Sequence, residues 1–350
     1  MIEVTGEAQR QAWDESVMPP VELVRPGLWS IPVPIPRNPL RYLLAYALEV
    51  DGGVALVDAG WNTEEAWSAL TGGLEAIGAD IEMVRAVLVT HIHPDHYGLA
   101  GRVREASGAW VALHPADAAA LPDRYHDMDR LIGDMRALLA ACGVPDDEGA
   151  ELTIASMGIR PLVELVQPDV LIEDGARVDL PGVELQAIWT PGHSPGHLCF
   201  WEGRRRLLLS GDHVLPRISP NISIHSQQRP DPLADFLESL MKVRGLDAEE
   251  VLPAHEWRFR NLAARVDELA AHHADRLVEI EEVVRRDGPA TCWEVTTALT
   301  WSRPWEDIAP FMRRAANGET LAHLMLLTGV GSLTRSDGIP WRWSPAQAAA

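Results

Sequence analysis

One short segment of the sequence places four potential metal ligands within six residues. The run THIHPDHYG carries His91, His93, Asp95 and His96, and it follows the apolar stretch MVRAVLVT, which ends at Thr90. Imidazole and carboxylate groups are common ligands of divalent transition metals. Side chains spaced in this way at the end of a strand can converge on one or two ions. The segment therefore predicts a metal site at a strand end.

Three other potential ligands also follow apolar, strand-like runs. His193 lies in VELQAIWTPGHSPGH, Asp212 ends RRRLLLSGDH after its apolar run, and His255 lies in EEVLPAHE. Runs of β-branched and aliphatic residues are typical of buried strands, and the ends of sheet strands commonly carry functional sites. We therefore expect these residues to extend the same site.

The motifs HIHPDH, PGHSPGH, SGDH and PAHE, with VDAG around Asp58 upstream, resemble the five characteristic motifs of the metallo-β-lactamase superfamily. The resemblance spans about residues 21–256 and does not cover the C-terminal third. It implies an α/β fold, namely a four-layer αββα sandwich with the metals at one edge. The β–α alternation after an N-terminal hairpin pattern fits that architecture.

The resemblance also implies a role for each residue. The first metal would be bound by His91, His93 and His193, the second by Asp95, His96 and His255, and Asp212 would bridge both. Asp58 would orient a ligand loop, and His197 is expected to lie beside the ligands without binding metal. Asp95 and Asp212 are the residues expected to take part in catalysis. The cofactors would be two divalent cations, with zinc expected and iron or manganese as alternatives.

The leading functional hypothesis is a hydrolase that uses a metal-bridging hydroxide to cleave an ester, thioester or lactone bond of a small molecule. His93 stands where the family's oxygen-reducing diiron proteins carry a carboxylate, so that branch is disfavoured. An Asp at the bridging position, here Asp212, resembles the thioester, lactone and phosphoester hydrolases of the family more than its true β-lactamases. One alternative is a persulfide dioxygenase with a single iron, which the complete second ligand set disfavours. The other is an endoribonuclease with a nucleic-acid-binding C-terminal domain.

The composition and charge of the chain exclude some classes of binding partner. The formal net charge is −21 over 350 residues, and a uniformly acidic protein repels phosphate backbones, so nucleic acid is not expected as a partner. No apolar run approaches the length of a membrane span, and the N-terminus lacks the pattern of a signal peptide, which predicts a cytoplasmic protein without a membrane partner. The three cysteines are far apart in the sequence, which argues against a disulfide framework.

The predicted elements divide the chain into segments. Residues 1–20 form an N-terminal extension, 21–259 the catalytic domain, 260–344 a helical accessory domain and 345–350 a tail. Within the catalytic domain we expect a hairpin turn at 51–53, a helix over 63–77, a strand over 83–90 and a helix over 98–106. A helical insertion at about 115–168 contains apolar faces over 128–142 and 147–166. It is expected either to line a substrate pocket or to pack on the sheet.

The C-terminal segment weakly resembles a winged helix. A long helix from 262 is expected to end at 287–289, followed by a capped helix over 291–299, a helix over 319–327 and a strand pair around 336–338. The candidate recognition helix GETLAHLMLLTGVG has no Lys or Arg, so we expect this domain to pack on the catalytic domain or form a homodimer. Residues next to the metal motifs that could contact substrate are Trp61, Tyr97, Arg217 and Asn221.

Overall fold

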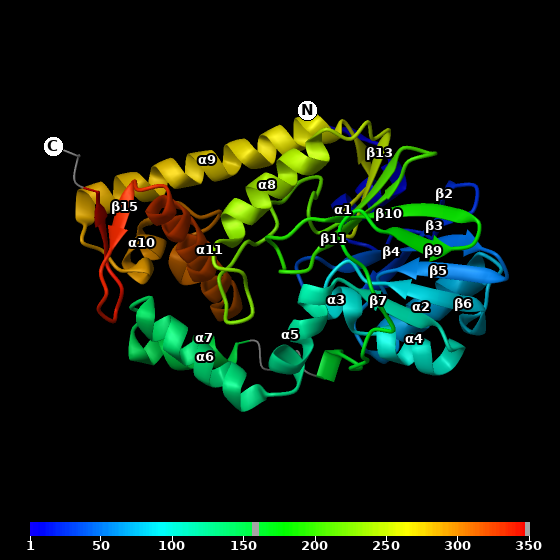
Figure 1. The fold of residues 1–350 in the computed structure, drawn as a ribbon, viewed down its shortest axis with the longest axis horizontal. Helices are drawn as coiled ribbons and strands as arrows, with labels where there is room; N and C mark the ends of the chain where they lie inside the picture. Colours follow the sequence, from blue (N-terminus) through cyan, green and yellow to red (C-terminus); the bar gives the residue numbers. More distant parts are fainter. Residues whose placement is uncertain (156–160, 347–350) are drawn as a thin grey trace. The chain divides into compact units, whose positions relative to one another are not determined.

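The structure is a computed structural model that describes residues 1–155 and 161–346 (Figure 1). The chain forms two compact units. Unit 1 comprises Met1–Leu121, Ile159–Pro220 and Ser239–Val266, and unit 2 comprises Pro122–Gly158, Asn221–Glu238 and Asp267–Ala350. The helices α5 (Pro115–Tyr125), α8 (Pro232–Arg244) and α9 (Leu262–Asp287) each run from one unit into the other.

Unit 1 contains two seven-stranded mixed sheets. The first has the order β2 (Glu22–Arg25), β3 (Leu28–Pro34), β4 (Tyr42–Val50), β5 (Gly53–Val57), β6 (Val84–Leu88), β7 (Trp110–Leu113) and β8 (Val170–Leu171). Its strands are antiparallel from β2 to β5 and parallel from β5 to β8. The predicted turn at 51–53 is confirmed, because Val50 pairs with Gly53 across it and Gly52 supplies a φ of 79°.

The second sheet has the order β1 (Glu3–Val4), β14 (Phe259–Arg260), β13 (Glu250–Pro253), β12 (Leu207–Gly211), β11 (Leu198–Glu202), β10 (Val183–Trp189) and β9 (Arg177–Leu180). Only β12 and β13 are parallel neighbours in it. The inner faces of both sheets contribute to one apolar core, and Tyr46 of β4 donates a hydrogen bond from its hydroxyl to the carbonyl oxygen of Pro253 at the end of β13. The two sheets are therefore packed face to face.

Helices cover the outer faces of unit 1. On the first sheet, α2 (Glu64–Ala76) packs on β3, and α4 (Ala100–Ser107) packs on β6 and β7. The predicted N-cap of α2 is confirmed, because the Thr63 side chain accepts a hydrogen bond from the Ala66 backbone N–H. Short helices α1 (Glu7–Glu15), α3 (Pro94–Tyr97) and the 3-10 turn η1 (Ile81–Met83) complete the unit with the ends of α8 and α9. The predicted four-layer αββα architecture is confirmed.

Unit 2 is mostly helical. It contains α6 (Met128–Ala141), α7 (Asp146–Ile154), α10 (Cys292–Ala298), η3 (Trp305–Asp307), α11 (Pro310–Gly329) and a hairpin of β15 (Leu333–Arg335) and β16 (Trp343–Pro345). The predicted capping box is present: the Thr291 side chain accepts from the Glu294 N–H, and the Glu294 carboxylate accepts from the Thr291 N–H. The predicted strand pair around 336–338 is also present.

Three sequence-based expectations differ from the structure. The helix expected over 147–166 ends at Ile154 as α7, and residues 156–160 lie outside the described residues. The helix expected over 319–327 is longer and begins at Pro310, a residue whose fixed φ suits the first helical turn. The apolar faces of the helical insertion belong to the core of unit 2, where Leu139 and Leu152 meet Val284 and Leu324 from the C-terminal segment.

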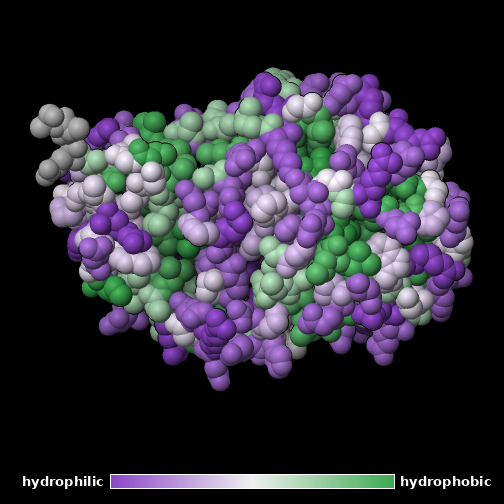
Figure 2. Space-filling view, viewed as in Figure 1, coloured by the Kyte–Doolittle hydropathy of each residue, from purple (hydrophilic) through white to green (hydrophobic). Residues whose placement is uncertain are grey.

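Exposed apolar side chains are scattered among hydrophilic ones on the face drawn in Figure 2. Among the described residues, no helix is both long enough and apolar enough to cross a membrane. The three cysteines are buried as free thiols, which agrees with the expectation that the chain has no disulfide framework.

Candidate metal centre

The predicted ligands all lie where strands of unit 1 end. His91 and His93 follow β6, and Asp95 and His96 lie in α3, which begins at Pro94. The remaining three come from the second sheet: His193 lies between β10 and β11, Asp212 follows β12, and His255 follows β13. The two packed sheets therefore deliver residues that are far apart in the sequence to one edge of the sandwich.

The side chains form three overlapping groups that could hold metal ions. The groups are His91, His93 and His193; His91, His96 and Asp212; and Asp95, His96 and His255. Within each group the ligand atoms lie within 4.8 Å of one another. The first and third groups match the sets that the motifs predicted for the two metals, although metal binding by these residues stays a prediction.

Asp212 lies between the two predicted sets. Its Oδ2 is 3.5 Å from the Nε2 of His193, which belongs to the first set. Its Oδ1 is 3.2 Å from the Nε2 of His255 and 3.5 Å from the Nε2 of His96, which belong to the second. Asp95 approaches the same pair, with its Oδ2 3.4 Å from His255 Nε2. The carboxylate of Asp212 therefore directs one oxygen toward each set.

The donor atoms fit a divalent cation. His96 Nε2, Asp212 Oδ1 and His255 Nε2 are buried, and none has a hydrogen-bond partner within residues 1–155 and 161–346. Buried polar atoms without partners are costly and need a specific explanation. Neutral imidazoles and carboxylates satisfy this requirement when they coordinate a cation.

Hydrogen bonds fix which nitrogen each imidazole presents. His96 donates from Nδ1 to the Asp58 Oδ2 at 2.8 Å, and His255 donates from Nδ1 to the Tyr42 carbonyl oxygen at 2.9 Å. In the neutral form each ring carries its proton on Nδ1, so Nε2 presents its lone pair toward the centre, where it binds either a second proton or a cation. Asp58 is itself held by the Thr90 N–H at 2.8 Å and by the Thr90 hydroxyl at 2.9 Å.

His197 is outside the three groups. Its Nδ1 lies 2.8 Å from the Thr190 hydroxyl, and its Nε2 accepts a hydrogen bond from the Asp212 backbone N–H at 3.1 Å. The ring therefore supports the loop that carries Asp212, beside the predicted ligands. Thr90 and Thr190 hold site residues in place and were not predicted, although each directly follows an apolar run in the sequence.

The charges at the centre favour cations. Burial acts to lower the pKa of His96, but the carboxylates of Asp58, Asp212 and Asp95 outweigh it and hold that pKa well above its usual value. Burial likewise opposes protonation of His255, yet Asp212 and Asp95 raise its pKa to about 10. Burial acts to raise the pKa of Asp212, but the neighbouring imidazoles hold it well below the usual range. The site thus attracts positive charge, whether as protons or as metal ions.

The four suggested substrate contacts have different surroundings. Tyr97 is buried, and its hydroxyl accepts a hydrogen bond from the Val166 N–H, which indicates a structural role. Arg217 pairs with the buried Glu256 through Nε at 2.8 Å. Asn221 belongs to unit 2, where its amide donates to the Ala315 carbonyl oxygen at 3.3 Å. Trp61 is partly exposed.

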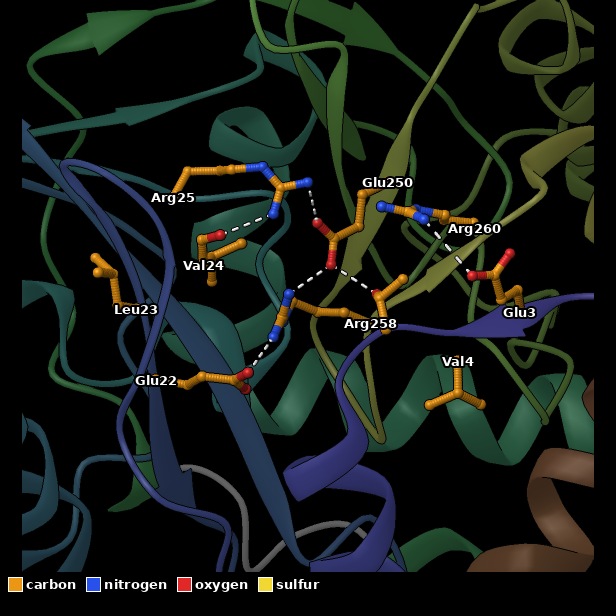
Figure 3. A pocket seen from close by; sticks show the side chains of 10 residues that line it. Glu3, Val4, Glu22, Leu23, Val24, Arg25, Glu250, Arg258 and Arg260 are labelled. Carbon is orange, nitrogen blue, oxygen red and sulfur yellow. Dashed lines mark hydrogen bonds and ion pairs between the residues drawn. The ribbon is translucent and has the colours of Figure 1, made fainter.

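The pocket drawn in Figure 3 is a separate feature of unit 1. It is an open hollow of about 360 Å³, lined by an ion network in which Arg258 pairs with Glu22 and Glu250, and Arg25 lies 2.9 Å from Glu250. Glu250 begins β13, whereas His255 follows the end of that strand. The network is built from charges of both signs and contains none of the predicted ligands.

Comparison with known proteins agrees with this geometry. The model of the Metallo-beta-lactamase superfamily matches residues 40–255. A probable metallo-hydrolase of Bacillus subtilis, YqjP, is 26% identical over 263 residues, which cover 73% of this chain and 80% of the relative.

Two solved structures resemble nearly the whole chain. A metallo-beta-lactamase family protein from Thermus thermophilus is 34% identical with a TM-score of 0.79, covering 92% of this chain and 100% of the other. A beta-lactamase domain protein from Burkholderia ambifaria is 26% identical with a TM-score of 0.79, covering 99% and 98%. The segment that the family model matches contains Asp58 and all seven predicted ligands, and the chain belongs to the metallo-β-lactamase superfamily.

Proposed function

We propose that the protein is a binuclear metal-dependent hydrolase that cleaves an ester, thioester or lactone bond of a small molecule. The observation that carries the proposal is the position of Asp212 between two sets of donors, with Oδ2 3.5 Å from His193 and Oδ1 3.2 Å from His255. A carboxylate that faces two sets of ligands suits a pair of cations better than a single one.

The residues that would hold the metals follow from the groups. His91, His93 and His193 would hold one cation, Asp95, His96 and His255 the other, and Asp212 both. When bound, divalent cations lower the pKa of water toward neutrality and stabilise negative charge on a carbonyl oxygen, and zinc is the metal we propose. No serine or cysteine nucleophile is then required.

The chain's own residues prepare the site for that chemistry. Asp58 and the Tyr42 carbonyl oxygen accept the Nδ1 protons of His96 and His255, so that Nε2 is the nitrogen of each ring that is directed inward. His197 holds the backbone of Asp212 from outside the ligand groups. These contacts fix the donor atoms before any substrate binds, which is the kind of preorganisation that metal hydrolysis requires.

The names of relatives support the reaction class and leave the substrate open. The Bacillus subtilis relative is named a probable metallo-hydrolase, and an Aspergillus niger relative, 26% identical over 232 residues, is named a lactamase-like protein. Neither name specifies an ester, a thioester or a lactone. The choice among these bonds is part of the proposal.

A substrate panel tests the proposal. Purified protein, loaded with zinc or left metal-free, would be assayed against esters, thioesters, lactones, phosphodiesters and persulfides, with Asp212→Ala as the control. We expect metal-dependent hydrolysis of at least one carbonyl substrate, and hydrolysis at least about 100-fold slower by the variant. Oxygen uptake with persulfides and one bound iron would instead identify a dioxygenase, and cleavage of phosphodiesters alone would identify a nuclease-type enzyme.

A further inference from the structure

A buried carboxylate joins the two loops that carry the first set of predicted ligands. Asp117 lies in the first turn of α5 and is fully buried. Its Oδ2 accepts hydrogen bonds from the Ile92 backbone N–H and from the Ser194 hydroxyl, both at 2.9 Å. Its Oδ1 accepts from the Gly196 backbone N–H at 2.6 Å. One side chain therefore connects segments that follow β6 and β10.

The donors to Asp117 are chain neighbours of ligands. Ile92 lies between His91 and His93, and Ser194 directly follows His193. These three histidines form the first group of potential ligands, whereas Asp117 belongs to none of the groups. Asp117 thus contacts two backbone N–H groups and one hydroxyl in the loops that carry the first set.

The start of α5 packs closely against the loop between β10 and β11. A Cβ atom added at Gly196 would lie 2.6 Å from the Asp117 backbone nitrogen and 2.7 Å from its Cβ, so a larger residue would push the loop away from α5. The His114 ring, just before α5, stacks on Trp189 at 4.9 Å with an interplanar angle of 8°. The Trp189 indole N–H in turn donates to the Pro195 carbonyl oxygen at 2.9 Å. The loop is held at more than one point.

The charge on Asp117 makes the connection strong. Hydrogen bonds to a charged acceptor are stronger than those between neutral groups, and a buried carboxylate that loses its donors is strongly unfavourable. The first turn of a helix also stabilises a negative charge. Separation of the two loops would leave this carboxylate buried and without several of its donors, so the loops are expected to keep a fixed spacing.

We propose that Asp117 is a positioning residue that sets the distance between His93 and His193, and thereby determines the affinity of the first metal position. The inference rests on the proposed metal centre, because it assigns a role toward a cation that those histidines would hold. It adds a residue that lies outside all five motifs. Outer hydrogen-bond partners of metal ligands typically change metal affinity by about 10- to 100-fold when they are replaced.

The test is Asp117→Asn, which keeps the size of the side chain and replaces one acceptor oxygen with an NH₂ donor. The full-length apoprotein would be titrated with cobalt(II), whose visible absorption reports ligand geometry at each position. We expect one of two cobalt equivalents to bind about 10- to 100-fold more weakly, with an altered spectrum, while the other keeps its affinity. Ser194→Ala removes a single donor and should weaken the same equivalent to a smaller degree.

The matched control is Glu250→Gln, which also converts a buried carboxylate of unit 1 to an amide, but within the ion network of Figure 3. Thermal unfolding of the apoproteins would compare the structural cost of the two changes. Unchanged cobalt affinity in Asp117→Asn, or an equal loss in Glu250→Gln, would overturn the proposal. If Asp117→Asn does not fold, Ser194→Ala decides in the same way. Failure of the wild-type protein to bind cobalt would instead refute the proposed function itself.

Discussion

Replacement of Asp58 by asparagine is expected to weaken the second metal position through a change in the protonation of His96. In the wild type, Asp58 Oδ1 accepts from the Thr90 N–H, and Oδ2 accepts from His96 Nδ1 at 2.8 Å. In the variant, an amide oxygen that remains on the Thr90 N–H directs its NH₂ group at His96. His96 must then accept at Nδ1 and carry its proton on Nε2, the atom that faces Asp95 and Asp212.

The size of the effect follows from the lost contact. A hydrogen bond to a charged partner contributes about 1.5–3 kcal/mol, and about 1.36 kcal/mol corresponds to a tenfold change in an equilibrium constant. The affinity of the second metal should therefore fall about 10- to 100-fold, in keeping with the effect of outer partners at other metal sites. The backbone should tolerate the change, because Asp58 has a φ of 63°, a region that asparagine adopts readily.

Competition with a chromophoric chelator would measure both metal affinities in Asp58→Asn and in the wild type. Glu202→Gln is a suitable control, because Glu202 is a buried carboxylate of unit 1 that accepts from the Arg205 N–H, outside the predicted ligands. We expect the control to bind both metals normally. Wild-type affinity for both metals in a folded Asp58→Asn protein would show that the carboxylate does not set the protonation of His96.

Three further outcomes are expected. Asp212→Ala should lower the rate of hydrolysis by at least about 100-fold and lose the second metal, while its circular dichroism spectrum stays unchanged. Trp61→Ala, as a comparison, should change substrate preference or have little effect. Near-normal turnover with full metal occupancy in Asp212→Ala would contradict the bridging role. Burial raises the pKa of Glu319 to about 7. Between about pH 4.5 and pH 7 the folded protein therefore keeps a proton on this carboxyl that the unfolded chain releases. The free energy of unfolding should fall as the pH rises through this range. Glu319→Gln should remove this decline, and thermal midpoints at pH 5 and pH 7.5 that shift equally in both proteins would refute it. Finally, fluorescence anisotropy should detect no salt-sensitive, submicromolar binding of the full chain to RNA or duplex DNA, because of the net charge of −21; such binding would contradict the expectation.

The metal motifs could be read from the sequence because each ligand lies within a few residues of a strand end. His91, His93 and His96 lie within six residues of one another, and the apolar runs before Asp212 and His255 identify the strands that carry them. The topology then follows from the family pattern. Local information of this kind also identified the Thr63 cap and the capping box at Thr291.

Features that depend on contacts distant in the sequence could not be predicted. The role of Asp117 arises only when α5 packs against loops on two different sheets, and its sequence neighbourhood PADAAALP resembles an ordinary helix start. Periodicity revealed the apolar faces of α6 and α9 but carries no information about which faces meet, so the shared core of Leu139 and Val284 was missed. The pairing of Arg258 with Glu22 and Glu250 could not be predicted for the same reason, because it joins different strands.

The most direct test of the account is the metal content of the full-length protein, purified without chelator and measured by mass spectrometry against a precise protein concentration. The two donor sets around Asp212 lead us to expect about two equivalents of divalent metal, chiefly zinc, with both lost in a variant that lacks His91 and His255. A single tightly bound iron, with no second equivalent after incubation with excess zinc, would contradict the binuclear centre.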